Sequence, residues 1–136
     1  MTSIERFEDL FAWQKARTLA REVCGAAAHG SFAKDFGLRD QANRAAASVA
    51  ANIAEGFERG GRPEFHQFLS IAKGSSGELR SHLYLALDRG HLDAVEFNRL
   101  KELADEVARL VSGLRTAVAR QRDAELKDKE ERSRHQ

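Results

Sequence analysis

The sequence predicts an all-α protein that folds as a single-domain, antiparallel, up-down-up-down four-helix bundle. Ala and Leu together number 36, whereas Val, Ile and Thr together number 12, and Pro63 is the single proline. Helices favour Ala and Leu and strands favour β-branched residues, so this composition excludes sheet architectures. The 136 residues suffice for one domain with its own core and are too few for two domains of ordinary size.

Four long segments show the spacing of apolar residues that is typical of helices. Their predicted bounds are about 8–28, 38–59, 63–89 and 93–122. Each of the first three is followed by glycine, which readily takes the positive φ needed after a helix end. These glycines are Gly30, Gly60 with Gly61, and Gly90. Pro63 suits a first helical turn, and Asp93 with Glu96 forms a capping box. The short connections predict antiparallel neighbours.

Each predicted helix has one apolar face for the core. In the third helix this face consists of Phe65, Leu69, Ala72, Ser76, Leu79, Leu83 and Ala86. The spacing of apolar residues continues unbroken through residues 74–77, although these contain two glycines. It therefore predicts one helix there and not two. The fourth helix offers Leu100, Leu103, Val107, Leu110, Leu114 and Ala117. The first offers Phe11 or Trp13, then Ala16, Ala20, Val23 and Ala27.

The last residues differ in character from the bundle. From about Ala119 onward, Leu126 is the only large apolar residue, and acids alternate with bases. We therefore expect residues 123–136 to form a tail that frays from the fourth helix and stays helical only where pairs such as Glu125 with Lys129 help. The tail is either a solubilising end or an arm that contacts RNA or a partner.

Composition also limits the function. The 22 basic and 21 acidic residues leave a formal net charge of +1, which does not favour strong, charge-driven binding of nucleic acid by one subunit. No apolar run approaches bilayer length, and the first residues lack the apolar core of a signal peptide. With the lone Cys24, these features predict a cytoplasmic protein without a disulfide or a membrane contact.

The pattern of chemistry-bearing residues predicts no enzyme. Glu78 and His82 lie one residue too far apart for the Glu-x-x-His pairs of a di-iron bundle. The histidines are scattered at His29, His66, His82, His91 and His135. Cys24 has no ligand cluster around it, and we expect it to be a small core residue. We predict no catalytic residue, no metal, no cofactor and no small-molecule substrate.

The second helix contains a stretch that favours self-association. Residues 45–54 span nearly three turns without a charged side chain, and a helix that is apolar all round is usually buried all round. The alternative is that Ala tolerates exposure and serves helix propensity. Gly74 and Gly77 make a smooth patch on the third helix, where each Gly costs about 1 kcal/mol relative to Ala. The predicted subunit interface comprises Ala46, Ser48, Val49, Ala50, Asn52, Ile53, Gly56, Phe68, Gly74 and Gly77.

Asn52 is the polar group within this apolar ridge. If buried, it needs hydrogen-bond partners, for which Ser75 or Ser76 is suitable. We expect it to fix packing register.

Several segments together carry a family resemblance. They include Phe7-Glu8-Asp9-Leu10, Trp13-Gln14-Lys15-Ala16, Asn52-Ile53-Ala54-Glu55-Gly56, Phe68-Leu69, Ala72-Lys73-Gly74-Ser75 and Glu78-Leu79. Over about residues 7–115 the chain resembles the four-helix bundle proteins of the 23S rRNA intervening-sequence (S23) family. The resemblance implies an antiparallel bundle without established catalytic residues. It also implies similarity to the accessory protein of diversity-generating retroelements. That relative assembles as a ring of five bundles and contacts nucleic acid. The resemblance thus implies a ring-like homopentamer.

Five basic residues are candidate contacts to nucleic acid or another anion: Lys34, Arg39, Arg44, Arg59 and Arg62. A ring repeats each of them once per subunit, which concentrates a weak positive patch. The alternative is that they bridge subunits or carboxylates. The leading hypothesis is a non-catalytic homo-oligomer that docks RNA or an RNA-associated protein. The alternative is a structural scaffold that binds another protein without nucleic acid.

Overall fold

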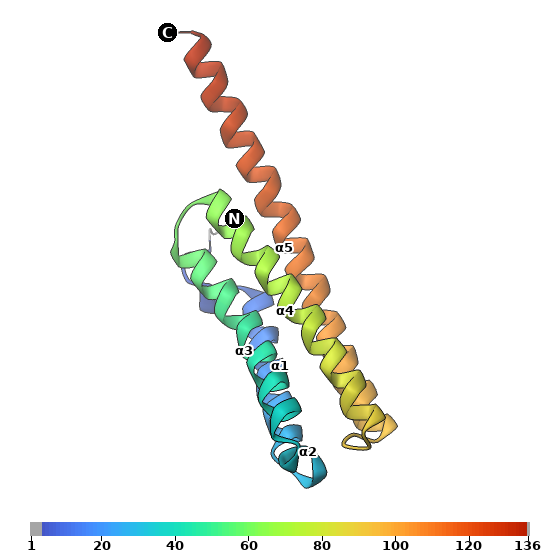
Figure 1. Cartoon of the computed structure of the whole chain (residues 1–136). Coiled ribbons are helices and arrows are strands. Elements are labelled where there is room, and N and C mark those ends of the chain that lie inside the picture. The colour runs from blue at the N-terminus through green and yellow to red at the C-terminus, as the bar shows by residue number, and fades with distance from the viewer. Residues whose placement is uncertain (1–3, 136) are drawn as a thin grey trace.

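Four long helices form the molecule. The computed structural model describes residues 4–135. After the short 3-10 helix η1 (Phe7–Asp9), the elements are α1 (Phe11–Ala27), the short α2 (Gly30–Lys34), α3 (Phe36–Glu58), α4 (Arg62–Asp88) and α5 (Ala94–Arg134), as Figure 1 shows. We call the end with α2 and the α4–α5 connection the lower end, and the opposite end the upper end.

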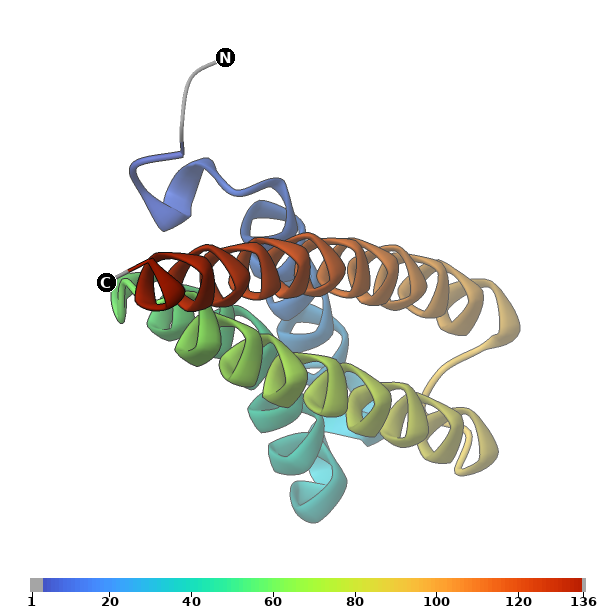
Figure 2. The same ribbon diagram turned by 90° about the horizontal axis from the view of Figure 1, so that it is seen from above.

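The long helices pack in the order α1, α3, α4 and α5, with α5 returning to α1. Consecutive long helices run antiparallel, which confirms the predicted all-α bundle. Figure 2 shows that the α4–α5 pair crosses the α1–α3 pair at an angle. One apolar core lies between the two pairs. Its largest fully buried side chains include Phe32, Leu19, Ile53, Leu69, Leu79, Leu83 and Leu100.

Helix α4 agrees with its prediction. It is continuous from Arg62 to Asp88, and it passes through Gly74 and Gly77 without a break. All seven residues of its predicted apolar stripe are buried: Phe65, Leu69, Ala72, Ser76, Leu79, Leu83 and Ala86. The three glycines predicted to follow helices, Gly30, Gly60 and Gly90, have φ of 61°, 82° and 77°.

Helix α5 differs from its prediction in two ways. It continues to Arg134, so residues 123–134 are helical where we expected a fraying tail (Figure 1). Glycine and proline, which end helices, do not occur between Gly113 and Gln136, and alternating charges support helical pairs such as Arg132 with Asp128. Its buried face is also rotated from the predicted one: Phe97, Ala104, Val111 and Val118 are buried, whereas the predicted core residue Ala117 is exposed.

Three predictions about the first third of the chain were wrong. The helix predicted from residue 8 is interrupted at the extended Leu10, so η1 and α1 are separate. The segment before α3, expected to be a loop, contains α2, whose Phe32 is fully buried. Cys24, expected in the core, is exposed on α1, because the buried positions there are Ala16, Leu19, Val23 and Ala27.

Candidate nucleic-acid interface

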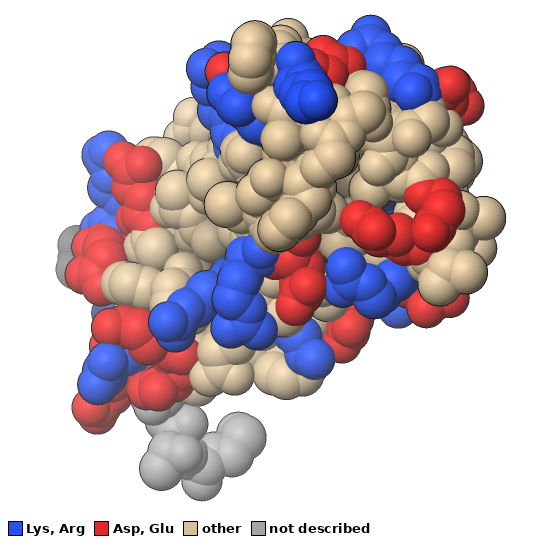
Figure 3. Space-filling model, turned by 90° about the horizontal axis from the view of Figure 1, so that it is seen from below, with Lys and Arg blue, Asp and Glu red and all other residues tan. Residues whose placement is uncertain are grey.

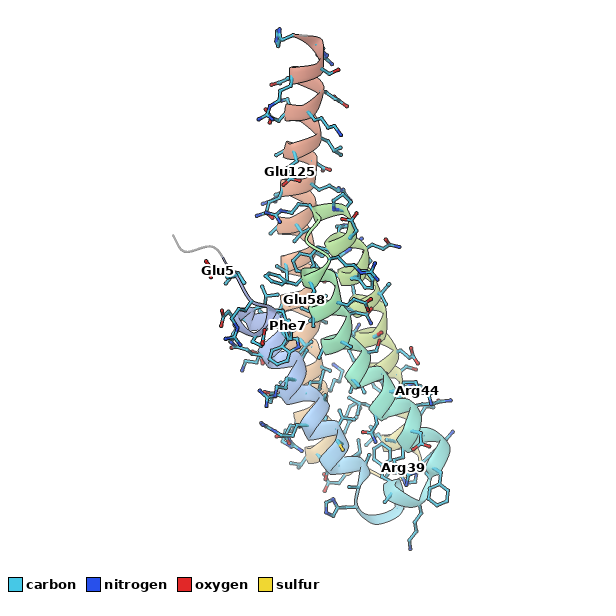
Figure 4. All side chains as sticks on the ribbon, turned by 90° about the vertical axis from the view of Figure 1, so that its left-hand side faces the viewer. Glu5, Phe7, Arg39, Arg44, Glu58 and Glu125 are labelled. Carbon is cyan, nitrogen blue, oxygen red and sulfur yellow. The ribbon has the colours of Figure 1, made fainter. Side chains whose placement is uncertain are left out.

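The five predicted anion contacts lie at two opposite ends of α3. Arg39 and Arg44 lie near its lower end, whereas Arg59 follows its last residue at the upper end. Twenty residues of helix separate Arg39 from Arg59, which corresponds to about 30 Å at 1.5 Å per residue. Figure 4 shows Arg39 and Arg44 at the lower end, far from Glu58 and Glu125. The five residues therefore do not form one site within a chain.

The two cations at the upper end are engaged by carboxylates. Arg59 Nη2 donates to Glu55 Oε1 over 2.9 Å, and its guanidinium lies 5.2 Å from the ring centre of Phe68. Arg62 Nε lies 3.6 Å from Glu125 Oε1 on the extended part of α5. Both contacts agree with the alternative hypothesis, in which the arginines pair with carboxylates and do not bind an anion. Little unpaired positive charge therefore remains at the upper end.

At the lower end, Arg39 and Phe36 form a stacked pair. The guanidinium of Arg39 lies 4.8 Å from the centre of the Phe36 ring. It is held there by hydrogen bonds of 3.0 Å from Nε to Asp40 Oδ1 and of 3.0 Å from Nη1 to the carbonyl oxygen of Ala33. Phe36 is 64% exposed. An aromatic ring at the surface is thus fixed against a cation.

Two further cations flank this pair. Lys34 is the last residue of α2, and Arg44 lies two turns along α3. Both are exposed, and within residues 4–135 neither has a carboxylate within 4.0 Å. We call the set of Lys34, Phe36, Arg39 and Arg44 the α3 corner. Three of its members were predicted as anion contacts, whereas Phe36 was missed, because it lies before the predicted start of that helix at residue 38.

Asp35 anchors the α3 corner to the rest of the molecule. Its side chain caps α3 by accepting a hydrogen bond from the backbone N–H of Leu38 over 3.4 Å. Oδ2 also accepts from His91 Nε2 over 2.8 Å and from Arg89 Nη1 over 3.0 Å, both in the α4–α5 connection. These bonds, from His91 first and then Arg89, lower the pKa of the Asp35 carboxyl.

Ser31 extends this cluster. Its hydroxyl lies 2.7 Å from His91 Nδ1, and the His91 ring stacks on Phe32 with 5.5 Å between ring centres. Serine, histidine and aspartate in a row also occur in hydrolases. Here the carboxylate additionally holds Arg89 and the Leu38 backbone, so we interpret the cluster as a structural link between the two helix pairs.

The residues predicted as a subunit interface have several environments. Ala46, Val49 and Ile53 are fully buried in the chain's own core, and Gly56 is buried against α4. Their burial is therefore explained without a second subunit. Ser48, Ala50, Asn52, Phe68 and Gly77 are half-buried, and Gly74 is exposed. Whether the surface-reaching members contact another copy stays a prediction.

Asn52 lies in a small polar network between α3 and α4. Its Nδ2 donates to the carbonyl oxygen of Ser48 over 2.8 Å and to Ser48 Oγ over 2.9 Å. Ser48 Oγ lies 2.8 Å from Ser75 Oγ on α4. The expected partner Ser75 is thus reached through Ser48, while the expected alternative Ser76 is buried in the core. The network links α3 to α4, and its role in fixing the register of the two helices stays a prediction.

The glycines within α3 and α4 differ in how closely other atoms pack against them. A Cβ at Gly56 would lie 2.6 Å from Phe68 Cβ, so close packing inside the chain requires this glycine. A Cβ at Gly74 would meet no atom within 4 Å, and one at Gly77 would meet only Arg80 Nη2 at 3.6 Å. Nothing within the described chain therefore requires glycine at these two positions.

No group of three or more His, Cys, Asp or Glu residues that could hold a metal ion occurs among residues 4–135. Glu78 and His82 contact each other over 3.4 Å without a third ligand. In the same part of the chain, each helix is too short or too polar to cross a bilayer.

Comparison with known proteins decides the family. The model of the family described as 23S rRNA-intervening sequence protein matches residues 8–113. The chain belongs to this family. A crystal structure of an S23 ribosomal protein family member from Bacteroides thetaiotaomicron, described as a protein with unknown function, has the same fold, with a TM-score of 0.70. It is 20% identical in sequence, and the match covers 76% of the present chain and 96% of that chain. No curated protein matches the sequence.

Proposed function

We propose that this family member is a non-catalytic, cytoplasmic homo-oligomer, a ring of five bundles, that docks RNA or an RNA-associated protein. The observation that supports self-association is the outer surface of α3 and α4. On α3, the exposed positions between Arg44 and Glu55 are Ala47 and Ala51, so about two turns present no charge to the surroundings.

The neighbouring part of α4, between Phe65 and Gly77, has the exposed Lys73 as its one Lys, Arg, Asp or Glu residue. Gly74 directly precedes Ser75, and the exposed Ala47 directly precedes Ser48. The hydroxyls of these two serines lie 2.8 Å apart. Ile71, one turn before Gly74, is 45% exposed. Small residues allow two helix backbones to approach closely, and Ile71 adds apolar area that a second copy would cover.

Ala51→Arg tests this proposal. Ala51 is exposed in the single chain, so a long charged side chain fits the folded subunit but not a dry contact between subunits. We expect the variant to keep its helical circular dichroism and to lose mass in light scattering coupled to size-exclusion chromatography. Ala124→Arg, on the exposed part of α5, is the matched control and keeps the mass. A monomeric wild-type protein, or an Ala51→Arg variant of unchanged mass, would contradict the proposal.

The α3 corner supports docking of RNA. Lys34 and Arg44 have no ion-pair partner within the described chain, and a ring repeats them around its axis. The charge on the lower end is nevertheless mixed: Figure 3 shows blue and red side chains interspersed around a broad uncharged area. We therefore expect RNA binding of moderate strength that depends on assembly.

A gel-shift titration with 23S rRNA fragments tests the docking. Binding should weaken as salt rises, because cations on the protein release counterions from the phosphates. Affinity that is absent, or indifferent to salt, would contradict RNA docking. A structural scaffold would instead co-purify with a polypeptide. The ratio of its absorbance at 260 nm to that at 280 nm would then be that of protein without nucleic acid.

A further inference from the structure

We propose that the α3 corner binds single-stranded RNA by stacking a base on Phe36. This inference rests on the RNA docking proposed above and adds the form of the RNA and the residue that contacts it. It assigns Phe36 to base stacking, and Lys34 and Arg44 to the flanking phosphates.

The exposure of Phe36 is the first observation. Phenylalanine is among the residues most often buried, yet Phe36 presents 64% of its surface, the largest exposed fraction of any described aromatic residue. It occupies the first position of α3, outside the core that begins at Leu38. The bundle itself therefore gains little from an aromatic ring at this position.

The fixed position of the ring is the second observation. Asp40 and the Ala33 carbonyl hold the Arg39 guanidinium over Phe36, so the side chains lose little freedom when a ligand binds. A base that stacks on the ring or on the adjacent guanidinium plane extends an existing stack. Such stacking on aromatic and Arg planes is the usual way in which proteins hold unpaired bases.

The surrounding charge is the third observation, and Phe11 shows its importance. Phe11 is also an exposed aromatic, at 56%, with the Lys15 ammonium 5.5 Å from its ring centre. However, Glu8 and Asp9 lie just before it in η1, and Lys15 pairs with Glu106. At the α3 corner three cations accompany two carboxylates: Asp40, which Arg39 engages, and Asp35, which Arg89 and His91 engage. The charge around Phe36 therefore favours phosphates more than the charge around Phe11, where Arg6 pairs with Glu8 and Asp9 adds a further acid.

The geometry favours single strands over duplexes. In a duplex both faces of an internal base are covered by its neighbours, whereas an unpaired base can turn outward and stack on a protein ring. A single exposed aromatic ring needs only one accessible base. Unpaired bases in the loops and bulges of structured RNA are accessible in the same way.

Fluorescence anisotropy with the full-length protein tests the inference. The probes are a labelled oligouridylate, an abasic oligomer of the same length and a blunt RNA duplex. We expect the oligouridylate to bind best, because the abasic oligomer offers phosphates without bases. Phe36→Ala should weaken oligouridylate binding by about tenfold, in keeping with the loss of one base stack. Phe11→Ala is the matched control and should leave the affinity unchanged.

Phe36→Trp supplies an independent readout. The indole retains the stacking surface and should keep the affinity, and its fluorescence should fall on binding, whereas wild-type fluorescence, from the single Trp13, should not. Both variants affect an exposed residue, and circular dichroism verifies their folding.

The outcomes separate the two proposals. If wild-type protein binds none of the probes and no rRNA fragment, RNA docking and base stacking both fail. If RNA binds but Phe36→Ala matches wild type, or if the abasic oligomer binds as well as oligouridylate, only the stacking inference fails. A change of solution mass in Phe36→Ala with unchanged RNA affinity would assign Phe36 to a subunit contact and overturn the inference.

Discussion

At the scale of single residues, Asp35 links the two helix pairs. It caps α3 and accepts hydrogen bonds from Arg89 and His91, which lie more than fifty residues away in the sequence. A cap just before a helix can be recognised from sequence. The partners in the α4–α5 connection cannot, because only the packing of the two helix pairs brings them to Asp35.

The lowered pKa of Asp35 predicts how stability depends on pH. Because the folded protein holds this carboxyl below its unfolded value of 3.8, the unfolded state binds the proton more tightly. The stabilisation is complete above the unfolded pKa and is lost as pH falls through the lower, folded pKa. Asp35→Asn should lower the midpoint of thermal unfolding by a few degrees at pH 7, and the difference from wild type should shrink in acid.

Thermal melts from pH 7 to pH 2 measure this difference. Asp123→Asn, at an exposed carboxylate that pairs with Arg122, is the control and should melt like wild type throughout. A difference between Asp35→Asn and wild type that stays constant from neutral to strongly acidic pH would show that the charge of Asp35 does not stabilise the fold.

At the scale of elements, the long helices could be predicted and the short or irregular pieces could not. The stripe of α4 keeps one period from Phe65 to Ala86, so no alternative face competes with it. In α5, both Leu103 and Ala104 fit the spacing, and packing against α1 and α4 selects Ala104 for full burial. The five residues of α2 are too few to show a period. Phe36 belongs to α3 only because that helix begins two residues earlier than predicted.

Gly74→Ala separates subunit stability from assembly on α4. The added methyl group meets no atom within 4 Å, so helix propensity should stabilise the subunit by about 1 kcal/mol and raise its melting midpoint by about 4 °C. At the proposed interface the same methyl group prevents close approach, so the solution mass at low concentration should fall.

Substitutions of two other glycines serve as comparisons for Gly74→Ala. Gly113→Ala on α5 also meets open space and should stabilise the subunit without changing its mass. Gly56→Ala places a methyl carbon 2.6 Å from Phe68 Cβ and should destabilise by about 1–3 kcal/mol. If Gly74→Ala behaves like Gly113→Ala in both measurements, the face of α4 around Gly74 is not a subunit contact.

At the scale of the whole molecule, the apolar core ends before helix α5 does. The last buried residue of α5 is Val118, yet the helix continues to Arg134 and projects beyond the bundle (Figure 1). The projecting part is exposed, including Leu126 at 53%, and it touches the bundle through the ion pair of Glu125 with Arg62. Exposed ion pairs of this kind contribute less than about 1 kcal/mol. The extension therefore adds little to the stability of the bundle, as the predicted boundary near residue 122 implies.

Truncation after Arg122 tests the role of this extension. Since no described residue beyond Val118 is buried, the shortened chain should fold with a melting midpoint within about 2 °C of the full chain, while its total helical signal falls. Its solution mass should correspond to the same number of subunits, because the proposed contact lies on α3 and α4. If truncation lowers that number, the extension holds subunits together. If the number is kept but RNA affinity falls, the extension is the RNA-contacting arm, and the α3 corner does not act alone.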